Sequence, residues 1–295
     1  MEERPVFPNK ILPYLLILPQ LIFTIVFFIW PAIQSVYLSL QRTDPFGLRS
    51  QFVGLANFIS LLTDKYYLQS IWTSIVFSLT VTLITLSVAL ILAVSANKPI
   101  YGSKIFRTLL IWPYALAPAV AGVLWLFLFQ PSIGILARFL NKIGINWNYH
   151  LNGMQALLMV ILVSSWKQVS YNFIFFLAGL QSIPQSLIEA AQMDGANSRK
   201  IFWSIVFPLL SPTTFFLIVM DLVYAFFDTF GVIDALTKGG PGKATEILVY
   251  KVYVDGTINF NISSSSAQSV ILLIIVSILT ALQFRFIEKR VYYGG

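Results

Sequence analysis

The hydrophobic pattern of this chain consists of long uncharged runs separated by short segments that carry charge. No charged residue lies between Lys10 and Arg42 or between Lys65 and Lys98. Each run exceeds the roughly 20 apolar residues that cross a bilayer as a helix, and the first exceeds the apolar core of a signal peptide, so we expect it to stay uncleaved. The pattern predicts six spans, at 11–41, 69–96, 107–130, 154–181, 208–233 and 267–286.

Composition supports a membrane protein. Of 295 residues, 57% are hydrophobic and 11% are charged, whereas about a quarter are charged in soluble domains. We therefore expect an all-α integral membrane fold in a single transmembrane domain, 1–295. The chain has no cysteine and one histidine, His150, which excludes disulfides, thiolate nucleophiles and Cys/His metal clusters.

The net charge of +7 comes from basic residues scattered among the loops. This distribution is typical of juxtamembrane Lys and Arg, so we expect a bilayer and no nucleic acid as partner. An even number of spans places both termini on one side. Lys and Arg are denser at the termini and in 97–107 and 183–207 than in the longer opposite loops, which predicts cytoplasmic termini.

One polar segment between two apolar runs has the features of a small folded unit, the loop 183–207. Pro184 suits the first turn of a helix, Gly195 suits its left-handed end, and Asn197 suits the N-cap of a second helix. The sequence predicts a helix–turn–helix at the membrane surface, with small side chains that allow another protein to approach closely. The alternative is an interfacial amphipathic helix without a partner.

Charged residues inside two of the runs are the other informative feature. A Lys or Asp at mid-bilayer costs on the order of 2.5–3.5 kcal/mol, so such residues usually face a cavity or a partner. On one span, helical spacing puts Lys167 and Tyr171 on one face and Gln168 and Asn172 on the adjacent face. On another span, Asp221, Tyr224 and Asp228 form one stripe. Two interpretations follow, a Lys–Asp pair that joins two helices or, as we favour, a polar pathway. Lysine there would suit an anionic substrate such as a phosphate ester.

No catalytic constellation is evident. A phosphate-binding loop needs G-x-x-x-x-G-K-[ST], and the nearest stretch, 239–244, lacks the Ser/Thr and the first glycine at the required spacing. We therefore predict no catalytic residue, no metal ligand and no cofactor on this chain. A membrane-embedded enzyme would need a nucleophile–base pair or metal set that is not found.

The polar loop carries a recognisable motif. Glu189-Ala190-Ala191, two residues, and Asp194-Gly195-Ala196, followed by Phe202, Ile205 and Pro208, resemble the cytoplasmic loop of ABC importer permeases. Thr237, Gly239-Gly240-Pro241 and Thr245 resemble a second signature of the sugar-type members.

The resemblance implies a type I importer permease fold whose coupling helix docks on an ATPase subunit. It assigns docking or loop-closing roles to Glu189, Ala190, Ala191, Asp194, Gly195 and Ala196. It also places Ser164, Lys167, Gln168, Tyr171, Tyr224 and Asp228 at or near positions that line the substrate pathway.

Within this family, several segments are similar to the sn-glycerol-3-phosphate permeases, in particular the first of their two subunits. They include Leu12-Pro13-Tyr14-Leu15, Ser165-Trp166-Lys167-Gln168 and Tyr224 to Phe230. The resemblance implies a bacterial inner membrane, a second permease subunit, two ATPase subunits that bind ATP and Mg, and a substrate-binding protein. A neutral-sugar or disaccharide permease remains the alternative, and a secondary transporter is a weaker one because no inverted repeat is clear.

Overall fold

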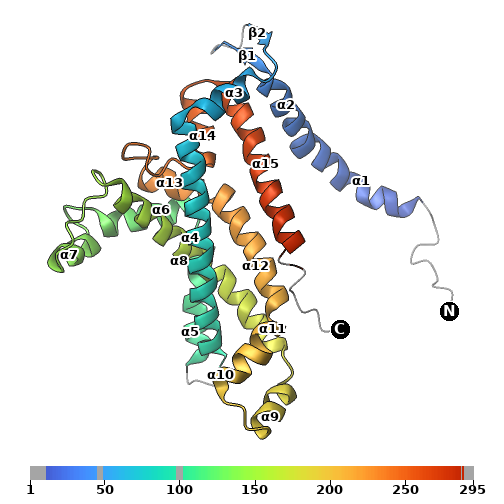
Figure 1. Ribbon diagram of the computed structural model, residues 1–295, viewed down its shortest axis with the longest axis vertical. Helices are drawn as coiled ribbons and strands as arrows, with labels where there is room; N and C mark the ends of the chain where they lie inside the picture. Colours follow the sequence, from blue (N-terminus) through green and yellow to red (C-terminus); the bar gives the residue numbers. More distant parts are fainter. Residues whose placement is uncertain (1–10, 45–48, 98–101, 287, 289–295) are drawn as a thin grey trace. The chain divides into compact units, whose positions relative to one another are not determined.

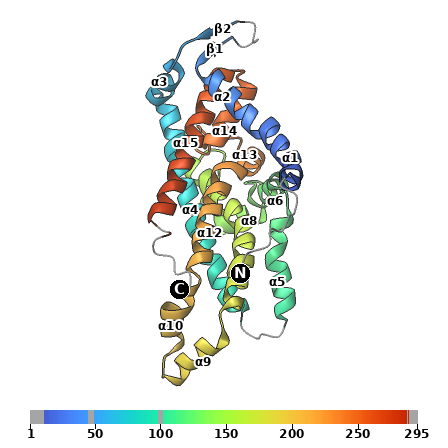
Figure 2. The same ribbon diagram turned by 90° about the vertical axis from the view of Figure 1, so that its right-hand side faces the viewer.

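The computed structural model describes residues 11–44, 49–97, 102–286 and 288. The chain divides into two compact units, Met1–Asp64 with Val252–Ile271, and Lys65–Lys251 with Leu272–Gly295. Figures 1 and 2 show the helices of both units. The predicted all-α membrane fold agrees with the elements described below.

The first unit begins with an apolar helical segment, Leu12–Ser39, built from α1 (Leu12–Thr24), a π-helical turn at Ile25–Ile29 and α2 (Trp30–Ser39). No side chain of α1 is buried, which leaves its apolar surface available to lipid or to another protein. It is followed by an antiparallel pair, β1 (Gln41–Thr43) and β2 (Ser50–Phe52), and by α3 (Ala56–Thr63).

The first unit also contains the π-helical turn Val254–Ile258 and the start of α15 (Ile262–Phe286). The Thr43 N–H donates to Ser263 Oγ at 2.9 Å, which fixes β1 to the first turn of α15. Residues 263–266 are therefore helical, and the sixth span begins at Ile262 rather than at 267 as predicted. Asn261 accepts from the Ser264 N–H at 3.1 Å and so provides the cap.

The second unit is organised around α4 (Lys65–Ala96) and α8 (Gly153–Ser182), which run side by side (Figure 1). Both contact α12 (Ser211–Val223). Ala89 and Ala93 are fully buried in the core near Phe173 and Leu217, and such small residues let membrane helices approach closely. These helices overlap the second, fourth and fifth predicted spans, and α4 begins four residues before 69.

The third predicted span, 107–130, is broken. It consists of α5 (Ser103–Ile111), a 3₁₀ turn at Trp112–Ala115 and α6 (Pro118–Phe129), with a bend of 105° between the two halves. Pro118 has no N–H to donate and Pro113 interrupts the preceding turn, so the helical hydrogen bonds stop there. Among the described residues, five helices are long and apolar enough to span a membrane, or six if the bent pair is one span.

Shorter helices complete the second unit. They are α7 (Ile135–Lys142), α9 (Gln185–Met193), α10 (Ser198–Ile201), α11 (Phe207–Leu209) and α13 (Phe230–Leu236), with π-helical turns at Phe202–Val206 and Tyr224–Asp228. α14 (Leu248–Tyr253) begins in this unit and ends in the first. In both ribbon views, α9 and α10 lie beyond one end of α12, while α13 follows its other end. The predicted loop 183–207 is thus separated from α13 by the length of a membrane-spanning helix.

Candidate functional site

The loop between α8 and α12 folds as the sequence predicts. Gly195 has φ +78°, so α9 ends in a left-handed residue. The Ala196 N–H donates to the Ala191 carbonyl at 3.0 Å, which is the 6→1 hydrogen bond of a Schellman motif. No atom lies within 4 Å of a Cβ built at Gly195. Glycine is therefore favoured here by the left-handed backbone conformation and not by lack of space for a side chain.

The second half of this loop is also capped. The Asn197 side chain accepts from the Lys200 N–H at 2.8 Å, at the start of α10. Ile188, Ala191 and Ala196 pack against the buried core of the second unit. One side of α9 is thereby fixed to the membrane-spanning helices, so a displacement of α9 acts on them directly.

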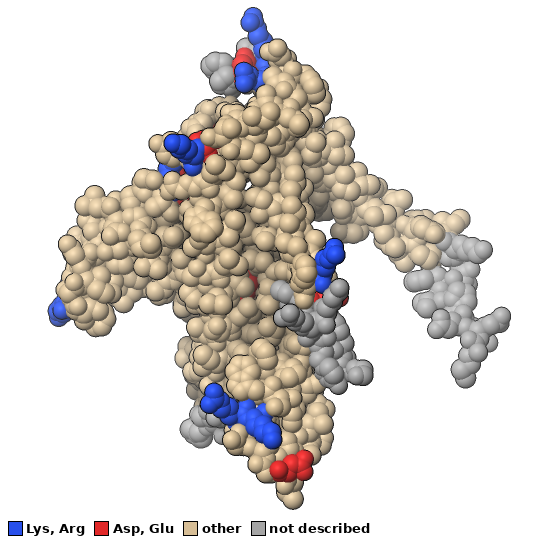
Figure 3. All heavy atoms as spheres, in the orientation of Figure 1, with Lys and Arg blue, Asp and Glu red and all other residues tan. Residues whose placement is uncertain are grey.

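The other side of α9 is exposed. Glu189, Ala190 and Asp194 are exposed, and Met193 has 89% of its surface accessible. Figure 3 shows acidic and basic side chains gathered at the end of the molecule where α9 and α10 lie. This side of α9 is therefore open to a partner.

Farther along the same unit, a cavity of about 380 Å³ lies between the broken third span, α8 and α12. Its lining residues are Tyr114, Pro118, Lys167, Gln168, Tyr171, Met220, Val223, Tyr224 and Asp228. They come from five segments: the 3₁₀ turn Trp112–Ala115, α6, α8, α12 and the π-helical turn Tyr224–Asp228. The two halves of the broken span thus each contribute a residue to the cavity wall.

Lys167 is the basic residue of this cavity and is only 8% exposed. Its Nζ lies 5.4 Å from the centroid of the Tyr114 ring, within the range of a cation–π contact. No ion pair joins Lys167 to Asp221 or Asp228, all three of which the structure describes. The ammonium group therefore keeps hydrogen-bond donors for a ligand.

Asp221 is fully buried and accepts three hydrogen bonds instead of pairing with Lys167. Thr85 Oγ1 donates to Oδ2 at 2.7 Å, Asn172 Nδ2 donates to Oδ2 at 2.7 Å, and Gln168 Nε2 donates to Oδ1 at 2.8 Å. These donors come from α4 and α8, so the carboxylate links three helices. Charge-assisted hydrogen bonds of this kind are stronger than neutral ones.

The structure brings together five of the eight predicted pathway residues: Lys167, Gln168, Tyr171, Tyr224 and Asp228 line one cavity. The other three, Ser164, Asn172 and Asp221, are 0% exposed and do not belong to its lining. Ser164 contributes through its carbonyl, which accepts from the Tyr224 hydroxyl at 3.2 Å. A direct substrate role for these three stays a prediction.

Sequence reasoning missed four lining residues. Tyr114 and Pro118 belong to the broken span, and the two prolines that mark the break are the signal that could have found them. Met220 and Val223 precede Asp221 and Tyr224 by one position each and are apolar, so nothing in the sequence distinguishes them from lipid-facing residues.

The Gly-Gly-Pro motif forms a rigid loop after α13. The hydroxyls of Thr237 and Thr245 lie 2.7 Å apart, and Thr245 also donates to the Gly240 carbonyl at 2.9 Å. Gly239 has φ +78°, and a Cβ there would lie 2.9 Å from the Tyr250 ring. Glycine is needed at position 239 for two reasons, because φ is positive and because there is no space for a side chain.

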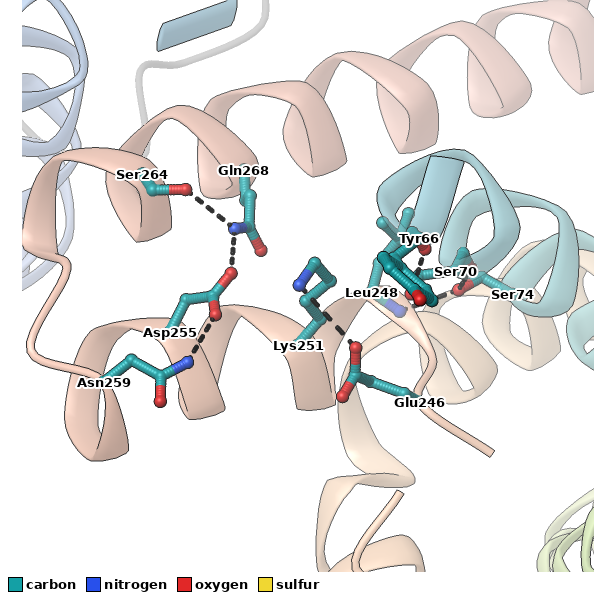
Figure 4. A network of polar contacts seen from close by, with 10 residues as sticks. All are labelled: Tyr66, Ser70, Ser74, Glu246, Leu248, Lys251, Asp255, Asn259, Ser264 and Gln268. Carbon is teal, nitrogen blue, oxygen red and sulfur yellow. Dashed lines mark hydrogen bonds and ion pairs between the residues drawn. The ribbon is translucent and has the colours of Figure 1, made fainter. Parts of the chain in front are cut away.

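Figure 4 shows the polar contacts of the segment that follows. In the second unit, the Leu248 N–H donates to Ser74 Oγ at 2.8 Å, and Lys251 pairs with Glu246 at 3.6 Å. The bond to Ser74 attaches the segment after the Gly-Gly-Pro loop to α4, and the ion pair lies within that segment. In the first unit, Asp255 accepts from Asn259 at 2.9 Å and from Gln268, which joins the π-helical turn to α15.

The sequence matches a family described as the binding-protein-dependent transport system inner membrane component, over residues 85–293. The chain belongs to this family. It is therefore a transport permease component of an inner membrane, as predicted, and not an enzyme.

Full-length relatives and solved structures agree with this assignment. The chain is 58% identical over 292 residues to a protein of Rhizobium meliloti (strain 1021), covering 99% of this chain and 100% of the relative. It is 59% identical to one of Agrobacterium fabrum (strain C58 / ATCC 33970), with 99% and 100% covered, and 55% identical to one of Yersinia enterocolitica, with 99% of each covered. All three are named sn-glycerol-3-phosphate transport system permease protein UgpA.

A solved bacterial ABC transporter involved in import of the acidic polysaccharide alginate has a chain with the same fold. Its TM-score is 0.78 at 22% identity, covering 93% of this chain and 96% of that one. A second structure shows a bacterial alginate ABC transporter in complex with an alginate pentasaccharide-bound periplasmic protein. Its TM-score is 0.78 at 23% sequence identity, covering 94% of this chain and 95% of that one. The type I permease fold predicted from the sequence is confirmed.

Proposed function

We propose that this chain is one of two permease subunits of an ATP-driven importer, and that it forms part of the pathway for sn-glycerol-3-phosphate and its phosphodiesters. The observation that carries the substrate class is Lys167, a buried lysine without an ion-pair partner on the wall of a polar cavity. The names of relatives at 55–59% identity supply the particular molecule.

The chemistry of the cavity fits a small phosphate ester. Its volume of about 380 Å³ is at the lower end of the range for small-molecule sites. Lys167 would donate to the phosphate, while Asp228 and the tyrosine hydroxyls would bond the glycerol hydroxyls.

The partners in this proposal are a homologous second permease subunit, two ATPase subunits that bind ATP and Mg, and a substrate-binding protein. The exposed side of α9 would dock on an ATPase subunit through Glu189, Ala190 and Asp194, with both termini of the chain in the cytoplasm. ATP-driven closure of the ATPases would displace α9, tilt α8 and α12, and open the cavity outward. Hydrolysis would reverse the motion and open it inward.

The test is the ATPase activity of the complex reconstituted with its partner subunits and binding protein, with glycerol-3-phosphate or maltose added. Stimulation by glycerol-3-phosphate alone is the expected result. Stimulation by maltose alone would keep the permease mechanism and reject the substrate.

A permease for a neutral sugar or disaccharide is the second candidate, and one observation favours it. Asp228 lines the same cavity as Lys167, so the two charges offset each other without a direct ion pair. If a neutral sugar is the substrate, Lys167→Gln will leave its uptake largely intact.

A further inference from the structure

Gln168 is the residue that belongs both to the cavity and to the buried Asp221 cluster. It lines the cavity beside Lys167, and its Nε2 donates to Asp221 Oδ1 at 2.8 Å. One end of this side-chain amide is therefore engaged away from the cavity. If the amide nitrogen is engaged, Gln168 offers a ligand a hydrogen-bond acceptor. If the amide oxygen is engaged, it offers a donor.

The Asp221 carboxylate determines the answer. An ionised carboxylate only accepts hydrogen bonds, whereas an amide has a donor end and an acceptor end. Turning the Gln168 amide over would place its oxygen against a fully buried carboxylate oxygen, which is repulsive. The nitrogen must therefore face Asp221, and the amide oxygen is the end left for the cavity.

A neighbouring amide shows that this arrangement is specific to Gln168. Asn172 also donates to Asp221, at 2.7 Å, but its Oδ1 is buried without a hydrogen-bond partner. Asn172 is 0% exposed and outside the cavity lining. Of the two amides held by Asp221, Gln168 alone can present its oxygen to a ligand.

We infer that Asp221 is a positioning residue that fixes Gln168 with its amide oxygen toward the cavity, creating a hydroxyl acceptor next to the Lys167 ammonium. This inference rests on the proposed function, because it assumes that the cavity receives the substrate. The cavity then selects phosphate esters that carry a free hydroxyl. A phosphate ester without one would leave the Gln168 oxygen unpaired in a buried site, which is unfavourable.

The inference is tested by comparing uptake of glycerol-3-phosphate and propyl phosphate into proteoliposomes that contain the complete complex and its binding protein. Propyl phosphate keeps the phosphate monoester and lacks both hydroxyls. Because every variant is assayed with the same binding protein, that protein's own preference cancels in comparison with wild type. The measured quantity is the ratio of kcat/KM for the two substrates.

Asp221→Asn gives the side chain a donor, so the Gln168 amide is free to turn its oxygen away from the cavity. We expect the preference for glycerol-3-phosphate to fall by about five- to tenfold, the value of one hydrogen bond. Gln168→Met, which leaves Asp221 and its other donors in place, should produce the same loss. It also tests the inference if Asp221→Asn does not assemble.

Thr85→Val is the matched control, because Thr85 donates to Oδ2 of the same carboxylate and does not line the cavity. We expect it to lower the amount of assembled complex and leave the substrate preference unchanged. If Asp221→Asn, Gln168→Met and Thr85→Val all alter both uptakes equally, Asp221 has only a structural role and the inference is wrong. Failure of the wild-type complex to take up glycerol-3-phosphate would instead reject the proposed function.

Discussion

The α9 loop and the polar cavity belong to the same unit but are constructed in opposite ways. The loop is exposed and closed by local contacts, such as the bond from the Ala196 N–H to the Ala191 carbonyl. The cavity is lined by segments far apart in the chain, and the buried cluster next to it joins Thr85 to Asp221 across 136 positions. Local rules therefore determine the surface that would meet the ATPase, while tertiary packing determines the surface that would meet the substrate.

The sharpest way to separate these two regions is Lys167→Gln, which removes the charge of the cavity and leaves α9 intact. We expect glycerol-3-phosphate uptake to fall on the order of 100-fold, because hydrogen bonds to a charged group contribute about 1.5–3 kcal/mol each. Assembly with the ATPase subunits should be unchanged. Lys243→Gln is the control, because Lys243 lies outside the cavity, with its Nζ 4.5 Å from the Tyr66 ring. Normal uptake by Lys167→Gln would return that lysine to a structural role.

Asp221→Ala tests whether the buried cluster holds the helices together. The amide donors of Gln168 and Asn172 would lose their acceptor, whereas Thr85 Oγ1 also lies 2.9 Å from the Val81 carbonyl oxygen. At about 1–3 kcal/mol for each amide, we expect a loss of roughly 2 kcal/mol or more in the free energy of unfolding. Denaturant unfolding in detergent measures it. Thr85→Val removes one donor and should lose only about 1 kcal/mol. Equal effects of the two substitutions would contradict the central role of the carboxylate.

Gly195→Asp disrupts the α9 loop and leaves the cavity intact. A side chain at φ +78° costs about 1–2 kcal/mol, and the new carboxylate adds charge to the exposed side of α9. We expect the complex to insert and bind substrate but to lose at least about tenfold of its substrate-stimulated ATPase activity. Gly195→Ala separates backbone strain from charge and should lose less. Wild-type stimulation in Gly195→Asp would reject the docking role of this turn.

Asn197→Ala should have the smallest effect. Loss of an N-cap costs about 1 kcal/mol, and α10 has only four residues, so we expect the helix start to open more often. Faster hydrogen exchange of the Lys200 amide, with uptake reduced by less than about threefold, is the expected outcome. An unchanged exchange rate would mean that packing of Ile201 alone maintains α10.

The same contrast explains which features the sequence predicted. The uncharged runs predicted the apolar helices, Gly195 predicted the turn after α9, and Asn197 predicted the cap of α10. These features could be predicted because each depends on residues that are close in the sequence. The direction in which the Asp221 side chain points could not be predicted from nearby residues. Its expected stripe with Tyr224 and Asp228 assumed regular α-helical spacing, whereas Tyr224–Asp228 is a π-helical turn that is wider. Asp228 therefore reaches the cavity while Asp221 faces α4 and α8.

The break in the third span has a consequence for how selectivity should be understood. Between Ala115 and Pro118 the backbone is extended, and its helical hydrogen bonds are reduced to those from the Leu116 N–H to the Pro113 carbonyl at 3.3 Å and from the Ala121 N–H to the Ala117 carbonyl at 3.0 Å. In a membrane the remaining polar groups of this stretch persist only where they meet protein or water, so we expect water in the adjoining cavity before any solute enters. Entry of a substrate is then an exchange of water for solute. The permease discriminates between two solutes by how well each replaces the hydrogen bonds that this water makes.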